Sequence, residues 1–206
     1  MRGAEAVAEK FQMNRDELDD WALRSHALAV KARDEGSLSD ILVAPFMRGR
    51  GETICQDESI RPKISAKLLK RLQPLVPNGR FITAGNACLT HDGAAFLLLC
   101  SKKYAAEHNL KIEAELMDVL SLGVDPNLSP LSTVPVVEKL LARNQLTVKD
   151  ITAWEFNEAF AVIDVLATKK LGIPKERYNI FGGALAYGHP YGASGGIITL
   201  HLLKAL

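Results

Sequence analysis

Apolar residues recur at helical spacing through the first third of the chain. The opening segment, residues 1–11, reads as an amphipathic helix. Asn14 followed by Glu17 is a capping-box pattern, and the apolar positions after it predict a long helix that ends at Gly36. A proline followed by regularly spaced leucines predicts a further helix within residues 62–73. This part of the chain is therefore expected to be mainly helical.

From Arg80 the pattern changes to short apolar runs bounded by turn residues. RFITAGN and AAFLLLC, residues 80–86 and 94–100, are typical of buried strands, and ITAWEF, residues 151–156, predicts a third strand. Strands that alternate with helices indicate an α/β fold. Helices are predicted between and after these strands, at residues 102–108, 134–143, 158–171 and 197–206.

Charge and apolar content exclude several classes of protein. The 206 residues are 48% hydrophobic and 24% charged, which is typical of a folded globular protein. With 25 Lys and Arg against 24 Asp and Glu the net charge is +1, so we expect no nucleic-acid partner. The longest apolar run, residues 94–100, is far shorter than the roughly 20 residues that span a bilayer, so we expect no membrane span. Residues 48–62 are polar and rich in Gly and Arg, and we expect them to be an excursion without a core.

Three cysteines, Cys55, Cys88 and Cys100, are odd in number and lack CxxC spacing. A disulfide framework or a metal site is therefore not expected. The first residues carry two glutamates and do not resemble a signal peptide, which favours a cytoplasmic protein. Cys100 ends an apolar run and is expected in the core.

Three segments carry the candidate chemistry, at residues 83–95, 154–161 and 182–196. Taken alone, Asn157 reads as the N-cap of the following helix, and His189 reads as a turn residue in a glycine-rich loop. Both would lie beyond the carboxyl ends of strands, where ligands collect, so they can meet. A neutral imidazole and an amide can donate hydrogen bonds to a developing oxyanion, which favours carbonyl chemistry. The glycines match neither the P-loop nor the dinucleotide-binding pattern.

TAGN followed by DGAA, NEAFA, GGA with GHP, and GASG, in this order and spacing, resemble the motifs of the thiolase family. The 32-residue separation of Asn157 and His189 fits that family, and the opening segments are similar to the start of its loop domain. The resemblance covers essentially the whole chain. It implies a layered α-β-α-β-α architecture, incomplete here, with a mainly helical loop domain. It divides the chain into a loop domain at 1–78, the last strand and helix of the N-terminal half at 79–112, and an incomplete C-terminal half at 113–206.

The resemblance also implies an activity. A thiolase joins two acyl-CoA molecules, or cleaves a 3-ketoacyl-CoA with CoA, through an acyl-enzyme on a cysteine. We therefore expect an acyl-CoA C-acyltransferase, most specifically an acetyl-CoA acetyltransferase, that forms homo-oligomers. CoA thioesters would be its substrates, and no cofactor is expected. No residue here matches the nucleophilic cysteine, and the chain stops before the family's CxGGG-type motif, so the chain alone is expected to be inactive.

By the same resemblance, His189 would activate the nucleophilic thiol and donate to the thioester oxygen. Asn157 would hold a water that completes this oxyanion site. Ala159 would contact the substrate, and Phe160 would pack beside the acyl group. These roles suit an enolate next to a thioester, which forms only where donors await its charge.

For the CoA part, the resemblance places Arg61 near the nucleotide and Cys88 near the pantetheine. Cys88 stands where the family commonly has serine, and a thiol is a weaker hydrogen-bond partner than a hydroxyl. Leu89 and His91 replace a usual glycine and asparagine, which would narrow or reline the pantetheine tunnel. Neither Cys88 nor Cys100 is expected to substitute for the missing nucleophile.

A second hypothesis remains open at the level of sequence. A truncated, non-catalytic thiolase-like chain would bind CoA or pair with a full-length paralogue. The coding sequence on either side of Met1 and Leu206 distinguishes the two hypotheses, because an open frame that encodes the cysteine motifs favours the enzyme and stop codons favour the binding protein.

Overall fold

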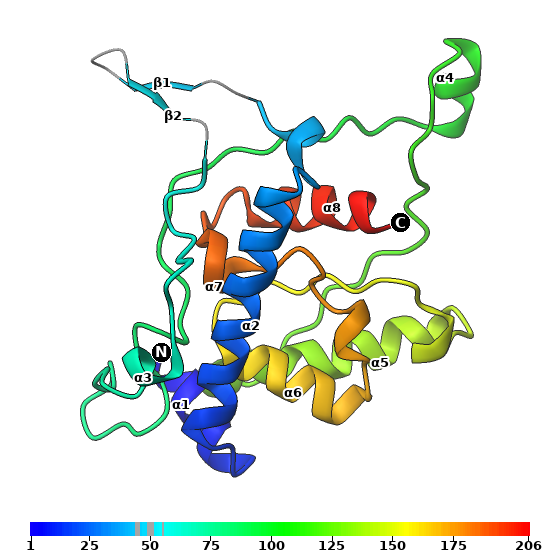
Figure 1. Cartoon of the computed structure of the whole chain (residues 1–206). Helices are drawn as coiled ribbons and strands as arrows, with labels where there is room; N and C mark the ends of the chain where they lie inside the picture. The colour runs from blue at the N-terminus through cyan, green and yellow to red at the C-terminus, as the bar shows by residue number, and fades with distance from the viewer. Residues whose placement is uncertain (44–45, 49–51, 55) are drawn as a thin grey trace.

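The computed structural model describes residues 1–43, 46–48, 52–54 and 56–206, with the backbone alone for 46–48 and 52–54. Helices dominate, and α2 runs through the middle of the molecule (Figure 1). The helices and strands are α1 (Arg2–Lys10), α2 (Arg15–Asp34), β1 (Phe46–Arg48), β2 (Glu52–Ile54), α3 (Ala66–Leu69), α4 (Lys102–Glu107), α5 (Thr133–Arg143), α6 (Ala161–Leu171), α7 (Ala184–Tyr187) and α8 (Ser194–Ala205).

Local signals start and end α2 as the sequence predicts. The Asn14 side chain accepts a hydrogen bond from the Glu17 backbone N–H at 2.8 Å, and the Glu17 carboxylate accepts one in return from the Asn14 N–H at 3.4 Å. The helix ends at Asp34, and Gly36 follows with a φ of +67°, where glycine is favoured. The predicted capped helix is thus confirmed.

The core lies where α2 meets α6 and α7. Trp21 of α2 packs edge-on against the Tyr178 ring, with centroids 5.2 Å apart, and Phe156 stacks on the same tyrosine at 4.8 Å. The Tyr178 hydroxyl donates to the Asp164 carboxylate of α6 at 2.7 Å. Residues 161–167 of α6 are all buried, so this part of the helix is stabilised by its neighbours and does not have one apolar and one polar face.

Most predicted helices are present, with shifted ends. Residues 2–10, 102–107, 133–143, 161–171 and 194–205 are helical, and Gly172 closes α6 in the left-handed conformation at φ +67°. The helix expected within residues 62–73 is only the single turn of α3, capped by the Ser65 side chain. In the part of the chain that the structure describes, no helix has the length and apolar character needed to cross a membrane.

None of the three segments predicted as strands is a β-strand in the structure. Across the described residues, the one sheet is the antiparallel pair β1–β2, where β2 lies within the segment expected to be an excursion and β1 begins two residues before it. Residues 94–100 lack a neighbouring strand, and Phe96 and Leu98 are 90% and 88% exposed. Their prediction as buried was wrong, and so was that of Cys100, which is exposed. An apolar run becomes a buried strand only where another strand supplies backbone partners.

What remains of the predicted sheet is a set of isolated bridges. Thr83 bridges Pro74, and Trp154 bridges Tyr178. Residues 86–90 form two further bridges, one to Phe160 and one to His189. These bridges are few, but they fix how the motif segments lie against one another.

Candidate active site

Residues 86–90 lie between the two other motif segments and join them. The Cys88 N–H donates to the carbonyl oxygen of Ala159 at 3.1 Å. On the other side, the His189 N–H donates to the carbonyl oxygen of Leu89 at 2.8 Å. The backbone of one segment therefore sets the spacing between the other two.

Across this junction the Asn157 and His189 side chains meet. Nδ2 of Asn157 lies 3.2 Å from Nε2 of His189. The N-cap interpretation of Asn157 is wrong, because the residue before α6 is Phe160 and no side chain caps that helix end. The interpretation of His189 as a mere turn residue also fails to describe its contacts, since both ring nitrogens have side-chain partners.

The contacts of His189 favour one tautomer. Ser194 Oγ lies 3.0 Å from the Pro190 carbonyl oxygen, to which it can donate, and 2.6 Å from Nδ1, from which it can then accept. This arrangement places the proton on Nδ1 and lets Nε2 accept from the Asn157 amide. Burial lowers the pKa of the imidazole, which favours the neutral ring. Tyr191 packs edge-to-face on this ring, with centroids 4.5 Å apart.

Behind the pair, a buried carboxylate ties the NEAFA segment to α2. Glu158 is fully buried and accepts hydrogen bonds from Trp21 Nε1 at 3.2 Å and Ser25 Oγ at 2.6 Å. Burial raises its pKa, and these hydrogen bonds oppose the rise. The Gly183 N–H donates to Ser25 Oγ at 3.0 Å, and a Cβ on Gly183 would lie 2.4 Å from the Glu158 carboxyl carbon. The first two residues of the GGA motif are glycines because α2 and Glu158 leave no room for a side chain there.

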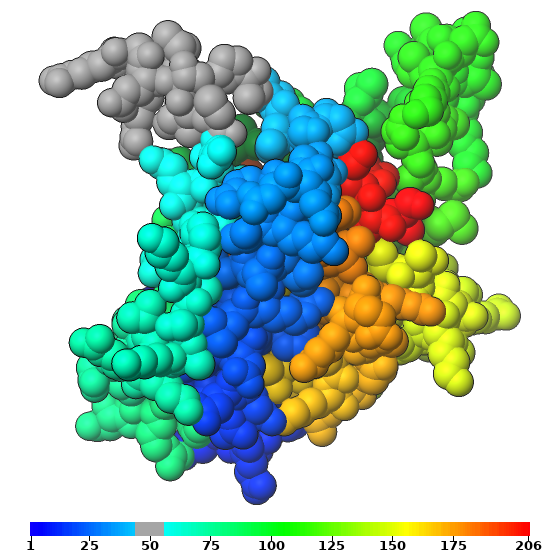
Figure 2. Space-filling model, viewed as in Figure 1, coloured from blue at the N-terminus to red at the C-terminus, as the bar shows by residue number. Residues whose placement is uncertain are grey.

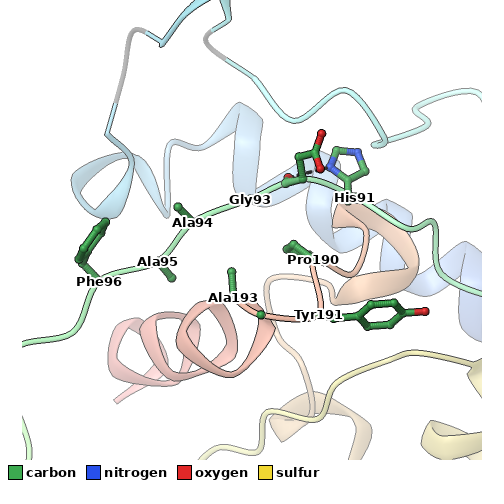
Figure 3. A pocket seen from close by; sticks show the side chains of 10 residues that line it. His91, Gly93, Ala94, Ala95, Phe96, Pro190, Tyr191 and Ala193 are labelled. Carbon is green, nitrogen blue, oxygen red and sulfur yellow. Dashed lines mark hydrogen bonds between the residues drawn. The ribbon is translucent and has the colours of Figure 1, made fainter.

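An open pocket of about 340 Å³ is lined by residues 91–96 and 190–193 (Figure 3). One wall is the extended segment 91–96, and the other is the turn at residues 190–193. Figure 3 shows Phe96 at one end and Tyr191 at the other, with Pro190 on the second wall. Tyr191 lines this pocket and also packs against the His189 ring, so this one residue connects the pocket with the imidazole.

The other predicted site residues fall into two groups. Ala159 and Phe160 are half-buried beside the motif junction, and Cys88 lies with them. Burial raises the pKa of the Cys88 thiol to about 11, so the thiol is protonated at neutral pH. Arg61 is exposed, and its backbone N–H donates to Nδ1 of His26 on α2 at 3.2 Å. The contacts that hold Arg61 are thus with α2 and not with the His189 pair.

Several supporting residues carry no signal that sequence reasoning used. Ser194 stands five residues after His189 within the GASG motif, and this short spacing is the only hint of its contact with Nδ1. The two partners of Glu158 on α2, Trp21 and Ser25, lie more than 130 positions away in sequence, so no local pattern indicates them. Among the described residues, no group of three or more His, Cys, Asp or Glu is arranged to hold a metal ion.

Comparison with known proteins identifies the family of the chain. Residues 2–103 match the family described as thiolase, N-terminal domain, and residues 110–206 match thiolase, C-terminal domain. A relative from Staphylococcus epidermidis, provisionally assigned as an acetyl-CoA C-acetyltransferase, is 40% identical over 202 residues, which are 98% of this chain and 52% of the relative.

Solved structures give the same relationship. The dimeric peroxisomal thiolase of Saccharomyces cerevisiae superposes with a TM-score of 0.94 at 33% identity, over 100% of this chain and 52% of that one. The human mitochondrial 3-ketoacyl-CoA thiolase in complex with CoA gives 0.90 at 32% identity, over 98% and 51%. The chain therefore spans about half the length of the relatives it matches. On these matches the fold is an incomplete α/β thiolase fold, and the chain belongs to the thiolase family.

Proposed function

We propose that this chain forms part of an acyl-CoA C-acyltransferase, and most specifically of an acetyl-CoA acetyltransferase. Such an enzyme condenses two acetyl-CoA molecules to acetoacetyl-CoA and CoA, or runs the reverse thiolysis. The observation that carries the proposal is the Asn157–His189 contact at 3.2 Å, together with the packing of the His189 ring against Tyr191, which lines an open pocket. The names of the relatives support the acyl-CoA class.

In this proposal His189 is the base. Its Nδ1 proton is held by Ser194, so the lone pair of Nε2 is the one available for a proton. A neutral imidazole at neutral pH can take the proton of a thiol and, once protonated, donate from Nε2 to a thioester oxygen. The Asn157 amide lies within hydrogen-bond distance of this nitrogen and would help to hold the oxyanion site.

The CoA part would contact the other predicted residues. Arg61 is exposed and offers a cation for the nucleotide phosphates, and the half-buried Cys88 would face the pantetheine with a weak donor. Ala159 and Phe160 would border the acyl group. The solved CoA complex of the human relative supports CoA as the ligand class, and the dimeric yeast relative supports a homo-oligomer.

The nucleophile is not among the described cysteines in this proposal. A thiol with a pKa near 11, as at Cys88, is a poor source of thiolate, and Cys100 lies exposed on the unpaired run 94–100. The chain by itself would then turn over no substrate. A non-catalytic chain that binds CoA or pairs with a full-length paralogue is the second candidate, and it shares this expectation.

A chimeric enzyme separates the two candidates. These residues replace the corresponding half of the Staphylococcus epidermidis relative, which supplies the flanking segments, and thiolysis of acetoacetyl-CoA is followed. If the catalytic proposal holds, the chimera turns over, and His189→Ala lowers kcat by at least about a hundredfold, the lower range of general acid–base catalysis. Thr199→Ala on α8 is the matched control and should keep the rate. A folded chimera that binds CoA without turnover would favour the non-catalytic candidate.

A further inference from the structure

Two polar side chains lie on one face of the extended segment that leads into the NEAFA motif. Side chains alternate along extended backbone, so Trp154 and Phe156 point to one side, and Glu155 and Asn157 point to the other. Trp154 and Phe156 stack in the core with centroids 6.1 Å apart. Glu155 and Asn157 both line a small cavity whose opposite wall is α7 and α8.

Three oxygens at this place need hydrogen bonds. Both carboxylate oxygens of Glu155 and Oδ1 of Asn157 are buried, and no group in the described part of the chain donates to them. Leaving a buried acceptor without a donor costs roughly 1–3 kcal/mol, so such groups are usually satisfied by protein or by water. Two unpartnered groups facing one cavity point to a shared donor.

The cavity has the size and lining for a single water. Its volume is about 20 Å³, which is enough for one water molecule. Apolar walls are supplied by Ala184, Ile197 and Ile198, so a water there would be directed toward the polar side. A buried water needs two or more polar partners, and the carboxyl of Glu155 and the amide oxygen of Asn157 provide them.

The charged and titratable surroundings favour a neutral Glu155. Burial raises the pKa of its carboxyl to about 8, and the Glu158 carboxylate adds to this, while Arg24 of α2 opposes it. On the other walls, Tyr187 and His201 face the cavity. A protonated carboxyl can donate to the water, which is then free to donate to the Asn157 oxygen.

We propose that this cavity holds one ordered water that bridges the Glu155 carboxyl and the Asn157 amide oxygen, which makes Glu155 a positioning residue for the Asn157–His189 pair. This proposal rests on the proposed function only in assuming that the Asn157–His189 pair acts in catalysis. The bridge itself is a property of this chain.

The bridge fixes which end of the Asn157 amide faces the histidine. With the oxygen held by the water, the Nδ2 group faces His189 Nε2 and donates to it. Without the bridge the amide can turn over and present its oxygen, which can only accept. That orientation stabilises a proton on Nε2 and so removes the lone pair that a base needs.

The test reads the protonation of His189 directly. In the whole chain with isotope-labelled histidine, NMR of the imidazole nitrogens gives the ratio of the Nδ1–H and Nε2–H tautomers at neutral pH. Glu155→Leu removes the carboxyl at similar volume, and it should shift this ratio at least about fivefold toward Nε2–H, the scale of one lost hydrogen bond. Glu155→Gln keeps a partner for the water and should leave the ratio as in the parent chain. The buried His26 on α2 reports that the fold is intact.

A second variant acts from the opposite wall. Ile198→Phe fills the cavity and leaves residue 155 as glutamate. It should shift the His189 tautomers in the same direction as Glu155→Leu. The proposal is overturned if both variants keep the parent ratio in a folded chain, or if Glu155→Gln shifts the ratio as much as Glu155→Leu. Because no turnover is measured, a chain without thiolase activity would still give either answer.

Discussion

The amide nitrogen of Asn157 lies 3.2 Å from Nε2 of His189, although 32 positions separate the two residues. The contact depends on backbone hydrogen bonds from residues 86–90 to both motif segments, and on Ser194, which holds the other ring nitrogen. The geometry of the Asn157–His189 pair is therefore a property of three segments together, and changes behind them should disturb it.

Glycine 183 tests how tightly these segments are packed. Gly183→Ala would place a Cβ 2.4 Å from the Glu158 carboxyl carbon, and relief requires that a fully buried side chain moves. We expect the free energy of unfolding in urea to fall by about 1–3 kcal/mol.

Glycine 195 is the matched control, because an added Cβ there meets nothing within 4 Å and the residue lies in α8. Gly195→Ala should leave the chain as stable or raise its stability by about 0.5–1 kcal/mol. Equal effects at the two glycines would contradict the close approach of Glu158.

The hydroxyl of Ser25 should matter to stability although it lies on α2, far from the motifs in sequence. It donates to Glu158 at 2.6 Å and accepts from the Gly183 N–H at 3.0 Å. Ser25→Ala leaves both groups short of a partner, so we expect a loss of about 1–3 kcal/mol in the free energy of unfolding. Ser121→Ala at an exposed position is the control and should change the free energy of unfolding by less than about 0.5 kcal/mol. Equal changes for Ser25→Ala and Ser121→Ala would contradict a stabilising role of the Ser25 hydrogen bonds.

Two buried histidines should each destabilise the folded chain as the pH falls from about 6.5 to 4. Burial lowers the pKa of His26 and of His201 to about 4, whereas the unfolded chain takes up these protons near pH 6.5. At these two groups the unfolded state binds more protons in this window, so their contribution favours unfolding.

His201→Phe removes one of these titrating groups while keeping a ring against Phe181 and Tyr187. Urea unfolding at several pH values should then show a smaller loss of stability between pH 6.5 and 4, by about 1–3 kcal/mol. A variant with the same pH dependence as the parent chain would show that His201 does not contribute.

Exposed apolar side chains should make the isolated chain self-associate. Phe96, Leu98 and Met117 are 90%, 88% and 77% exposed. In sequence they flank α4, which stands away from the body of the molecule (Figure 2). An extended apolar run without a partner strand favours pairing with another chain. Light scattering at micromolar concentration should detect oligomers.

The double variant Phe96→Lys and Leu98→Lys should shift this distribution toward the monomer. Leu68→Lys, at a half-exposed leucine on α3, is the control and should leave the distribution unchanged. A parent chain that is strictly monomeric at these concentrations would count against the prediction.

Sequence alone was sufficient where structure depends on neighbours along the chain. The capping pair Asn14–Glu17 and the glycine after α6 set helix ends through local hydrogen bonds and backbone freedom, so these elements were predictable. Residues 94–100 were not, because a strand exists only through a partner elsewhere, and none lies beside this run in the described residues.

The site divides in the same way. The meeting of Asn157 and His189 was predicted from their expected places beyond the carboxyl ends of strands, although the N-cap interpretation of Asn157 alone was wrong. Glu155 and Ser194 gave no usable signal, because their roles depend on a cavity wall and on a turn that form only in three dimensions.

The most direct measurement of the central claim is a titration of the whole chain with acetoacetyl-CoA, read at the imidazole nitrogens of His189 by NMR. If His189 and Asn157 form the base half of an acyl-CoA site, the His189 signals shift and saturate, while those of the buried His26 on α2 do not move. CoA alone should perturb the region of Cys88 with a smaller effect on His189. Saturable binding detected by calorimetry with no change at His189 would contradict the account.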